Sequence, residues 1–257
     1  MIANRSNTVF VHGMYMNGES WQPWIDRFSA HGYSVHAPSW PYHDGSPAAL
    51  RASIDPNLPS LTFGAVVDHL KRFIDTLPDR PVLIGHSVGG LLVQKLAHDG
   101  YARLAVPISP APPSGIISLD PHFYRANAPH LNLAAAGRPL IMTAKRFHYA
   151  FANTMSRADS DAAFERYVVP ESRRVPQSTL TQSRIDFRRA HVPMLFLAGD
   201  RDHLTPLDMV RRNVKACRKG EGPVEFRTMP GRSHLLCLQA GWEELADAAL
   251  AFIDKQS

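Results

Sequence analysis

The feature that most constrains the fold is the sequence Gly-His-Ser-Val-Gly at residues 85–89, which lies between two apolar segments. Residues 82–84 read Val-Leu-Ile, a pattern typical of a buried strand, and apolar residues recur at helical spacing after the motif. A sharp turn from strand to helix strains its central residue and requires small neighbours. We therefore expect Ser87 at the tip of such a turn, with Gly85 and Gly89 making room. The motif alone is a weak signal, and the alternative is an ordinary glycine-rich connection.

The rest of the chain alternates between strand-like and helix-like segments, which predicts a doubly wound, mostly parallel α/β sheet with helices on both faces. The strand-like segments are residues 8–11, 33–37, 82–84, 104–109, 192–198 and 224–228. Helices are expected from Ser20, which resembles an N-cap, over residues 63–77, after Ser87 and towards the C-terminus. A further helix is expected with Thr205 as its N-cap and Pro206 as its first residue. Residues 38–59 are rich in Pro, Ser, Asp and Gly and are predicted to form a long loop.

The alternation stops between residues 111 and 190, where only helix-like patches appear, at residues 145–155 and 161–169. We interpret residues 1–110 and 191–257 as one core and residues 111–190 as a mainly helical insertion. The alternative is a run of ordinary connecting helices.

Composition narrows the function classes. The 257 residues carry a net charge of +5, and arginines concentrate in the second half. No nucleic-acid-reading module accompanies them, so we expect a solvated basic surface that mildly favours anionic substrates. Two cysteines, Cys217 and Cys237, are too few for a disulfide framework and lack zinc spacing, so no metal or cofactor is expected. The polar N-terminus and the lack of a long apolar run predict a cytoplasmic protein without membrane contact; monomer and homodimer both remain open.

Polar residues suited to catalysis follow the predicted strands, at the edge where parallel sheets place their active groups. They are Ser87, Asp202 and His234, in that chain order. A serine hydroxyl attacks well only when a base removes its proton, and His234 can supply that base near neutral pH. Asp202 would orient the imidazole and stabilise its protonated form. The backbone N–H groups of Met14 and Val88 are expected to form the oxyanion hole, where each donor contributes ~3 kcal/mol to catalysis.

These motifs resemble those of the α/β-hydrolase superfamily, and the resemblance covers nearly the whole chain. The matching segments are residues 11–14 (Val-His-Gly-Met), 85–89, 199–206 (Gly-Asp-Arg-Asp-His-Leu-Thr-Pro) and 231–234 (Gly-Arg-Ser-His). The resemblance implies that residues 111–190 are a cap covering the pocket. It departs at the N-terminus, where the chain begins at the strand that the family usually counts third.

Several histidines and aspartates have alternative interpretations. Asp200 could replace Asp202 as the acid, and Asp120 is a remoter alternative, because some family members place the acid after the preceding strand. His86 is expected to pack beside the turn, and His12 to hold the oxyanion loop by hydrogen bonding. The histidines of the insertion, His122, His130 and His148, show no metal-ligand spacing.

The resemblance also narrows the reaction. Ser87 argues against the dehalogenases and epoxide hydrolases of this fold, which use an aspartate nucleophile. Leu235 stands where the related hydroxynitrile lyases carry a lysine. We expect an ester or lactone hydrolase; amide or carbon–carbon hydrolysis, cofactor-free perhydrolysis and a non-catalytic receptor remain alternatives. The expected substrate is an apolar or aromatic small molecule bound by pocket residues Tyr15, His86, Phe123, Phe147 and Leu235.

Overall fold

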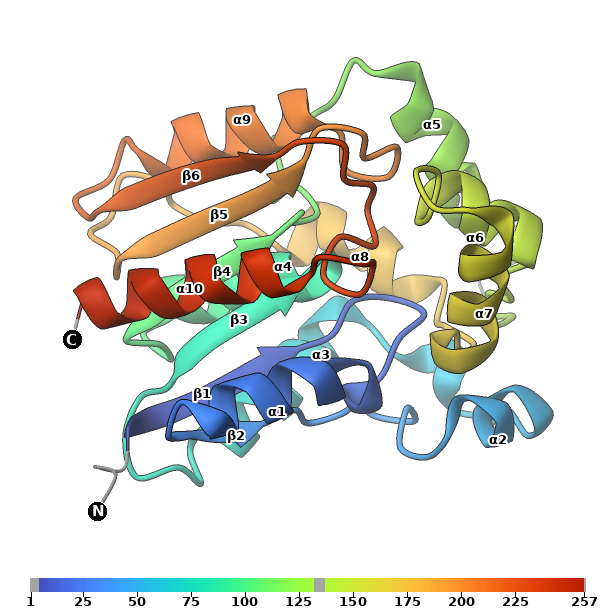
Figure 1. The fold of residues 1–257 in the computed structure, drawn as a ribbon, viewed down its shortest axis with the longest axis horizontal. Coiled ribbons are helices and arrows are strands. Elements are labelled where there is room, and N and C mark those ends of the chain that lie inside the picture. The colour runs from blue at the N-terminus through green and yellow to red at the C-terminus, as the bar shows by residue number, and fades with distance from the viewer. Residues whose placement is uncertain (1–4, 132–136, 257) are drawn as a thin grey trace.

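The computed structural model describes residues 5–131 and 137–256, and its centre is a six-stranded parallel sheet in the order β2-β1-β3-β4-β5-β6 (Figure 1). The strands are β1 (Arg5–Val11), β2 (Tyr33–His36), β3 (Val82–His86), β4 (Leu104–Ile108), β5 (Met194–Gly199) and β6 (Val224–Met229). Every neighbouring pair is parallel. The predicted parallel, doubly wound α/β architecture is confirmed.

Helices cover both faces of the sheet because alternate strand residues point to opposite sides. Val9, Val11 and Leu83 pack in the core cluster on one face, with α3 (Phe63–Ile74), α4 (Val88–His98) and α9 (Leu207–Cys217). Phe10 and Ile84 pack on the other face, with α1 (Gln22–Ala30) and α10 (Glu243–Lys255). Over residues 5–131 and 137–256, no helix is both long and apolar enough to cross a lipid bilayer.

The region between β4 and β5 contains helices and no strand of the main sheet within its described residues. These helices are α5 (Pro121–Asn127), the short η3 (Ala128–Leu131), α6 (Ala144–Ala150), α7 (Arg157–Tyr167) and α8 (Arg174–Gln182). Helices α5, α6 and α7 lie beyond the carboxyl ends of the strands (Figure 1). Helix α8 instead packs on α3, where the backbone N–H of Gly64 donates to Gln182 Oε1 at 2.7 Å. A division into core and cap at residues 111–190 remains a prediction.

The local structure differs from the sequence-based predictions at several points. Residues 38–59 are not all loop: they contain α2 (Pro47–Ala52), capped by the Ser46 hydroxyl, and the start of η2 (Leu58–Ser60). Ser20 does not cap a helix, because its hydroxyl donates to the Asn17 carbonyl within the short helix η1 (Gly18–Trp21). Helix α8 was not predicted, because Val175 is the only residue that it buries and because it carries a proline near its start.

Candidate active site

Ser87 occupies the strained turn that its motif predicts. Its backbone has φ 59° and ψ −121°, a conformation that residues other than glycine rarely adopt. Ser87 directly precedes α4. A Cβ on Gly89 would lie 2.2 Å from the Val11 carbonyl oxygen, and one on Gly85 would lie 2.3 Å from that of Gly89. Neither position can hold a larger residue, so the two glycines allow β1, β3 and α4 to meet closely at Ser87.

Asp202 and His234 form a buried pair at the carboxyl edge of the sheet. Nδ1 of His234 lies 2.7 Å from Asp202 Oδ2, and the two side chains have no exposed surface. Asp202 Oδ1 accepts hydrogen bonds from the backbone N–H groups of Leu204 and Thr205, each at 2.8 Å. Because the carboxylate is fixed from both sides, it fixes the imidazole in turn.

The hydroxyl of Thr205 belongs to this pair rather than to a helix cap. It donates to Asp202 Oδ2 at 2.8 Å, while α9 begins at Leu207 with Pro206 as its N-cap. The prediction of Thr205 as the N-cap was therefore wrong. Burial opposes ionisation of Asp202, but the His234 imidazole and the hydrogen bonds from Thr205 outweigh it, so its pKa lies below the usual value. The carboxyl group is an anion at neutral pH.

The other nitrogen of His234 is left open. Nε2 is buried and has no hydrogen-bond partner among the residues that the structure describes. The Phe151 ring lies edge-on to the imidazole, with centroids 5.0 Å apart. Nε2 of His86, directly before Ser87, donates to the His234 carbonyl oxygen at 2.8 Å. Burial, and then His234, lower the pKa of His86 to about 3, so it stays neutral and anchors the His234 backbone beside the turn.

The loop after β1 lies directly against Ser87. A Cβ on Gly13 would lie 2.9 Å from both the His86 carbonyl oxygen and the Ser87 Cβ, so only glycine allows this approach. Met14 follows in this loop, and Val88 begins α4 after Ser87; both are buried. The two segments that carry the predicted oxyanion donors therefore meet at the Ser87 side chain.

His12 holds this loop, as expected from the sequence. Its Nε2 accepts a hydrogen bond from the Trp40 backbone N–H at 3.0 Å, so Nδ1 is the protonated nitrogen and donates to the Gly13 carbonyl at 2.9 Å. Burial, and then the neighbouring His43, depress the pKa of His12 well below its ordinary value of 6.5. Neutral His12 thus links the loop to the segment after β2.

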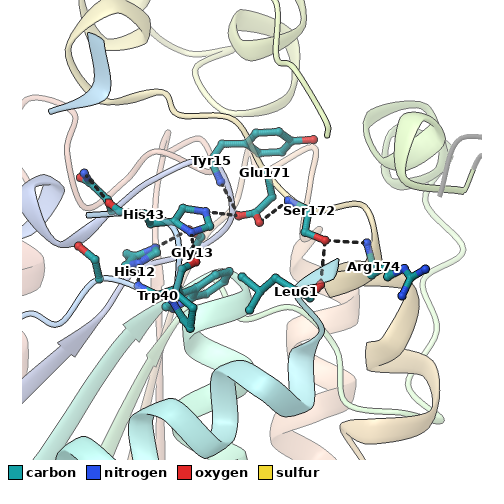
Figure 2. Close-up of polar contacts among 12 residues, drawn as sticks. His12, Gly13, Tyr15, Trp40, His43, Leu61, Glu171, Ser172 and Arg174 are labelled. Atoms are coloured by element: carbon teal, nitrogen blue, oxygen red, sulfur yellow. Dashed lines mark hydrogen bonds and ion pairs between the residues drawn. The ribbon is translucent and has the colours of Figure 1, made fainter. Parts of the chain in front are cut away.

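A second buried carboxylate, Glu171, supports the same loop, and Figure 2 shows it between Tyr15 and His43. One of its oxygens, Oε2, lies 3.3 Å from the Tyr15 backbone nitrogen and 3.3 Å from His43 Nε2. The other accepts from the Ser172 N–H at 2.6 Å. The Tyr15 carbonyl accepts from the Val169 N–H at 3.0 Å. Residues 169–171 therefore hold both polar groups of the Tyr15 backbone, whose φ is 64°.

Burial disfavours a proton on His43, but the charge and hydrogen bonding of Glu171 outweigh it and raise the His43 pKa above 6.5. Sequence reasoning missed this pair. Glu171 follows a proline and resembles an ordinary surface glutamate, and only the folded chain brings it to His43. Its full burial is visible in the structure alone.

The residues predicted to form one substrate pocket do not line a common cavity in the structure. Tyr15 lines a cavity under α5 and α6, and His86 lines a small cavity behind the turn. Phe147 and Leu235 are fully buried, with Phe147 stacked on Phe151. Phe123 is partly exposed on α5 and packs against Tyr124.

The two alternative acids have other partners. Asp200 accepts from the Gly231 N–H at 2.7 Å, and Asp120 caps α5 by accepting from the His122 N–H at 2.7 Å. Neither is a hydrogen-bond partner of His234 in the described part of the chain. The two cysteines are buried free thiols, and burial raises the pKa of each to about 12. Over residues 5–131 and 137–256, no three His, Cys, Asp or Glu side chains gather in a metal-binding arrangement.

Comparison with known proteins places the chain in a hydrolase family. A family model described as "Alpha/beta hydrolase family" matches residues 8–248. The chain is 24% identical to a non-heme chloroperoxidase, CPO-A1, of Kitasatospora aureofaciens, over 92% of this chain and 87% of that protein.

Solved structures share the fold at low sequence identity. The tomato methylketone synthase I complexed with 2-tridecanone has a TM-score of 0.74 at 16% identity, over 98% of this chain and 99% of that one. The Paleococcus ferrophilus monoacylglycerol lipase has a TM-score of 0.69 at 19% identity, over 99% and 96%.

Proposed function

The chain belongs to the alpha/beta hydrolase family, and on that basis we propose that it is a serine hydrolase that cleaves a carboxylic ester or lactone through an acyl-enzyme at Ser87. The observation that carries the proposal is the fully buried 2.7 Å hydrogen bond between Asp202 and His234. The His234 carbonyl is bound by His86, the residue directly before Ser87 in its strained turn. A buried acid–imidazole pair with its second nitrogen open is suited to general-base catalysis.

In the first half of the reaction, His234 Nε2 takes the Ser87 proton as Oγ attacks the ester carbonyl. The negative charge moves to the carbonyl oxygen, where the N–H groups of Met14 and Val88 stabilise it. Asp202 remains ionised and stabilises the imidazolium, because its pKa is held low. The tetrahedral intermediate collapses, the bond to the alkoxy oxygen breaks, and His234 donates its proton to the leaving alcohol.

In the second half, His234 takes a proton from water, and the resulting hydroxide equivalent attacks the acyl carbon. Collapse releases the carboxylic acid and returns the proton to Ser87 Oγ. The first loop is important in both halves, because Gly13, His12 and Glu171 together determine where the Met14 N–H lies. We therefore include Glu171 and His43 as positioning residues outside the triad.

Steady-state hydrolysis of p-nitrophenyl esters of increasing acyl length tests this proposal. We expect turnover by wild type on at least one ester, and kcat reduced on the order of 10⁶-fold by Ser87→Ala or by His234→Ala. Ser233→Ala, one residue from the base but hydrogen-bonded to Gln239, is the matched control and should retain kcat within about threefold. Wild-type-like hydrolysis by Ser87→Ala would refute the assignment of the nucleophile.

The similarity to a chloroperoxidase favours perhydrolysis as a second candidate activity. Hydrogen peroxide would replace water in the second half, so that the acyl-enzyme yields a peracid and free Ser87. Adding hydrogen peroxide during ester turnover tests this. Peracid that appears in wild type and not in Ser87→Ala supports perhydrolysis, and release of carboxylic acid alone excludes it.

A further inference from the structure

A cavity of about 110 Å³ lies between the loop after β1 and the helices of the 111–190 region. Part of its wall is hydrocarbon, including Leu140 and Met142, and part is polar. Its polar wall differs from that of an ordinary apolar ester pocket, because three guanidinium groups reach it from separate segments. They are Arg125 on α5, Arg146 on α6 and Arg173 immediately before α8.

The described residues that line the cavity include no Asp or Glu. Arg173 donates to the Pro129 carbonyl, and the nearby Glu171 carboxylate is bound to the Tyr15 backbone and paired with His43. The Arg146 side chain makes no ion pair or hydrogen bond with any described residue, and Arg125 lies over the Tyr149 ring at 4.2 Å. Arg173 is nine-tenths buried, so its charge acts in a less polar environment than the other two. The positive charges of the three arginines repel one another. An anion in the cavity would attract all three, and this attraction would offset their mutual repulsion.

The two titratable groups beside the arginines are neutral and mutually satisfied. The Tyr15 hydroxyl lies 2.9 Å from His130 Nε2, and His130 Nδ1 lies 3.1 Å from Asn127 Oδ1. An amide oxygen accepts only, so Nδ1 donates and Nε2 accepts from Tyr15. Burial, and then Arg173 and Arg146, lower the pKa of His130 to about 4. Neither group supplies a negative charge, and the cavity is a cationic site near neutral pH.

The cavity is adjacent to the triad. Tyr15, which lines it, follows Met14 in the oxyanion loop, and the Phe151 ring packs edge-on against both Tyr15 and His234. From this placement we infer that the cavity binds the carboxylate end of an anionic substrate, an ester or lactone of a dicarboxylic acid. The apolar wall contacts the hydrocarbon between the two ends, and the reacting carbonyl lies at Ser87. This inference rests on the proposed function and specifies its substrate class.

A guanidinium binds a carboxylate by charge and by paired N–H donors, so the preference should appear in kcat/KM. The substrates are p-nitrophenyl monoesters of glutarate, adipate, pimelate and suberate, each compared with the p-nitrophenyl ester of the monocarboxylate of equal length. Wild type should favour at least one anionic ester by about tenfold or more, and raising the salt concentration should reduce the preference. Arg146→Gln should lower kcat/KM for that ester by about three- to fivefold and leave its neutral partner within about twofold.

Arg188→Gln is the matched control, because it removes the same charge from an exposed arginine that does not line the cavity. This substitution should change kcat/KM for neither the anionic ester nor its neutral partner. Equal kcat/KM for anionic and neutral esters, with Ser87-dependent turnover of both, would overturn the cavity inference and leave the proposed function standing. Failure to turn over either class, with no fluorophosphonate labelling of folded wild type, would overturn both. Arg125→Gln provides an independent variant if Arg146→Gln does not fold.

Discussion

The carboxylate of Glu171 lies 3.3 Å from Nε2 of His43, and both side chains are almost completely shielded from water. The pair joins a segment of the 111–190 region to the chain after β2, and the same carboxylate receives the Tyr15 N–H. Because Tyr15 follows Met14, the charge of Glu171, a residue outside the proposed triad, contributes to the position of the Met14 N–H, the proposed oxyanion donor. This relationship gives the first two predictions.

Glu171→Gln removes the negative charge and retains the shape of the side chain. His43 then loses its charge partner, and removing one member of a buried pair costs about 3–5 kcal/mol of unfolding free energy. We expect a lower denaturation midpoint in urea and a reduced kcat for ester hydrolysis with a smaller change in KM. Glu165→Gln, which alters an exposed glutamate paired with Arg51, should cost less than about 1 kcal/mol. Equal effects of the two substitutions would remove the special role of Glu171.

The stability provided by this pair should depend on pH. The folded-state pKa of His43 is raised above 6.5, so its contribution is complete below that value and is lost as pH rises through the folded-state pKa. Other groups near His43 are Asp44, which raises its pKa further, and His12, which remains neutral. The difference in unfolding free energy between wild type and Glu171→Gln should therefore shrink as pH rises above 6.5. A constant difference across this range would contradict the assignment.

Acid should destabilise the fold through histidines that are buried in the neutral form. The pKa of His86 is lowered to about 3 and that of His130 to about 4 by burial, with nearby charges as the next cause. Below pH 6.5 these two histidines become protonated in the unfolded chain but stay neutral in the folded protein. Each therefore lowers the free energy of unfolding by up to ~1.4 kcal/mol for each unit by which the pH falls. His130→Asn should flatten the dependence of unfolding free energy on pH between 6.5 and 4. An unchanged slope would show that His130 does not remain neutral.

Substitution of Asp202 and of Asp200 tests which of the two aspartates is the acid that pairs with His234. Asp202→Asn leaves an amide beside His234 and disturbs the tautomer, so we expect kcat to fall by about 10³–10⁴-fold without unfolding. Asp200→Asn removes a negative charge but keeps an oxygen that can accept the Gly231 N–H, and should leave kcat within about threefold. Circular dichroism checks that both variants fold. The opposite order of effects would assign the acid to Asp200.

Strands and site loops were predictable because their signals are local. Short runs of consecutive β-branched and other apolar residues identify β1 and β3, and glycines at 85 and 89 indicate the turn at Ser87 before any contact is known. Ser87, Asp202 and His234 each follow a strand, so the topology of a parallel sheet brings them to one edge.

The contacts that were missed depend on the third dimension. Thr205 resembles an N-cap in sequence, but α9 begins two residues later, at Leu207, and the Thr205 hydroxyl donates to the Asp202 carboxylate. Neither the Glu171–His43 contact nor the approach of Arg125, Arg146 and Arg173 to one cavity has a periodic signal, because their segments are distant in the chain. Helix α8 forms against α3 through contacts such as Gln182 with Gly64, not through an apolar stripe of its own.

Intact-mass analysis after reaction with a fluorophosphonate probe tests the nucleophile most directly. The account predicts that folded wild type gains the mass of one phosphonyl group, that peptide mapping places it on Ser87, and that Ser87→Ala gains none. Labelling at another residue, or equal labelling of Ser87→Ala, would contradict the central claim that Ser87 is the nucleophile of this site.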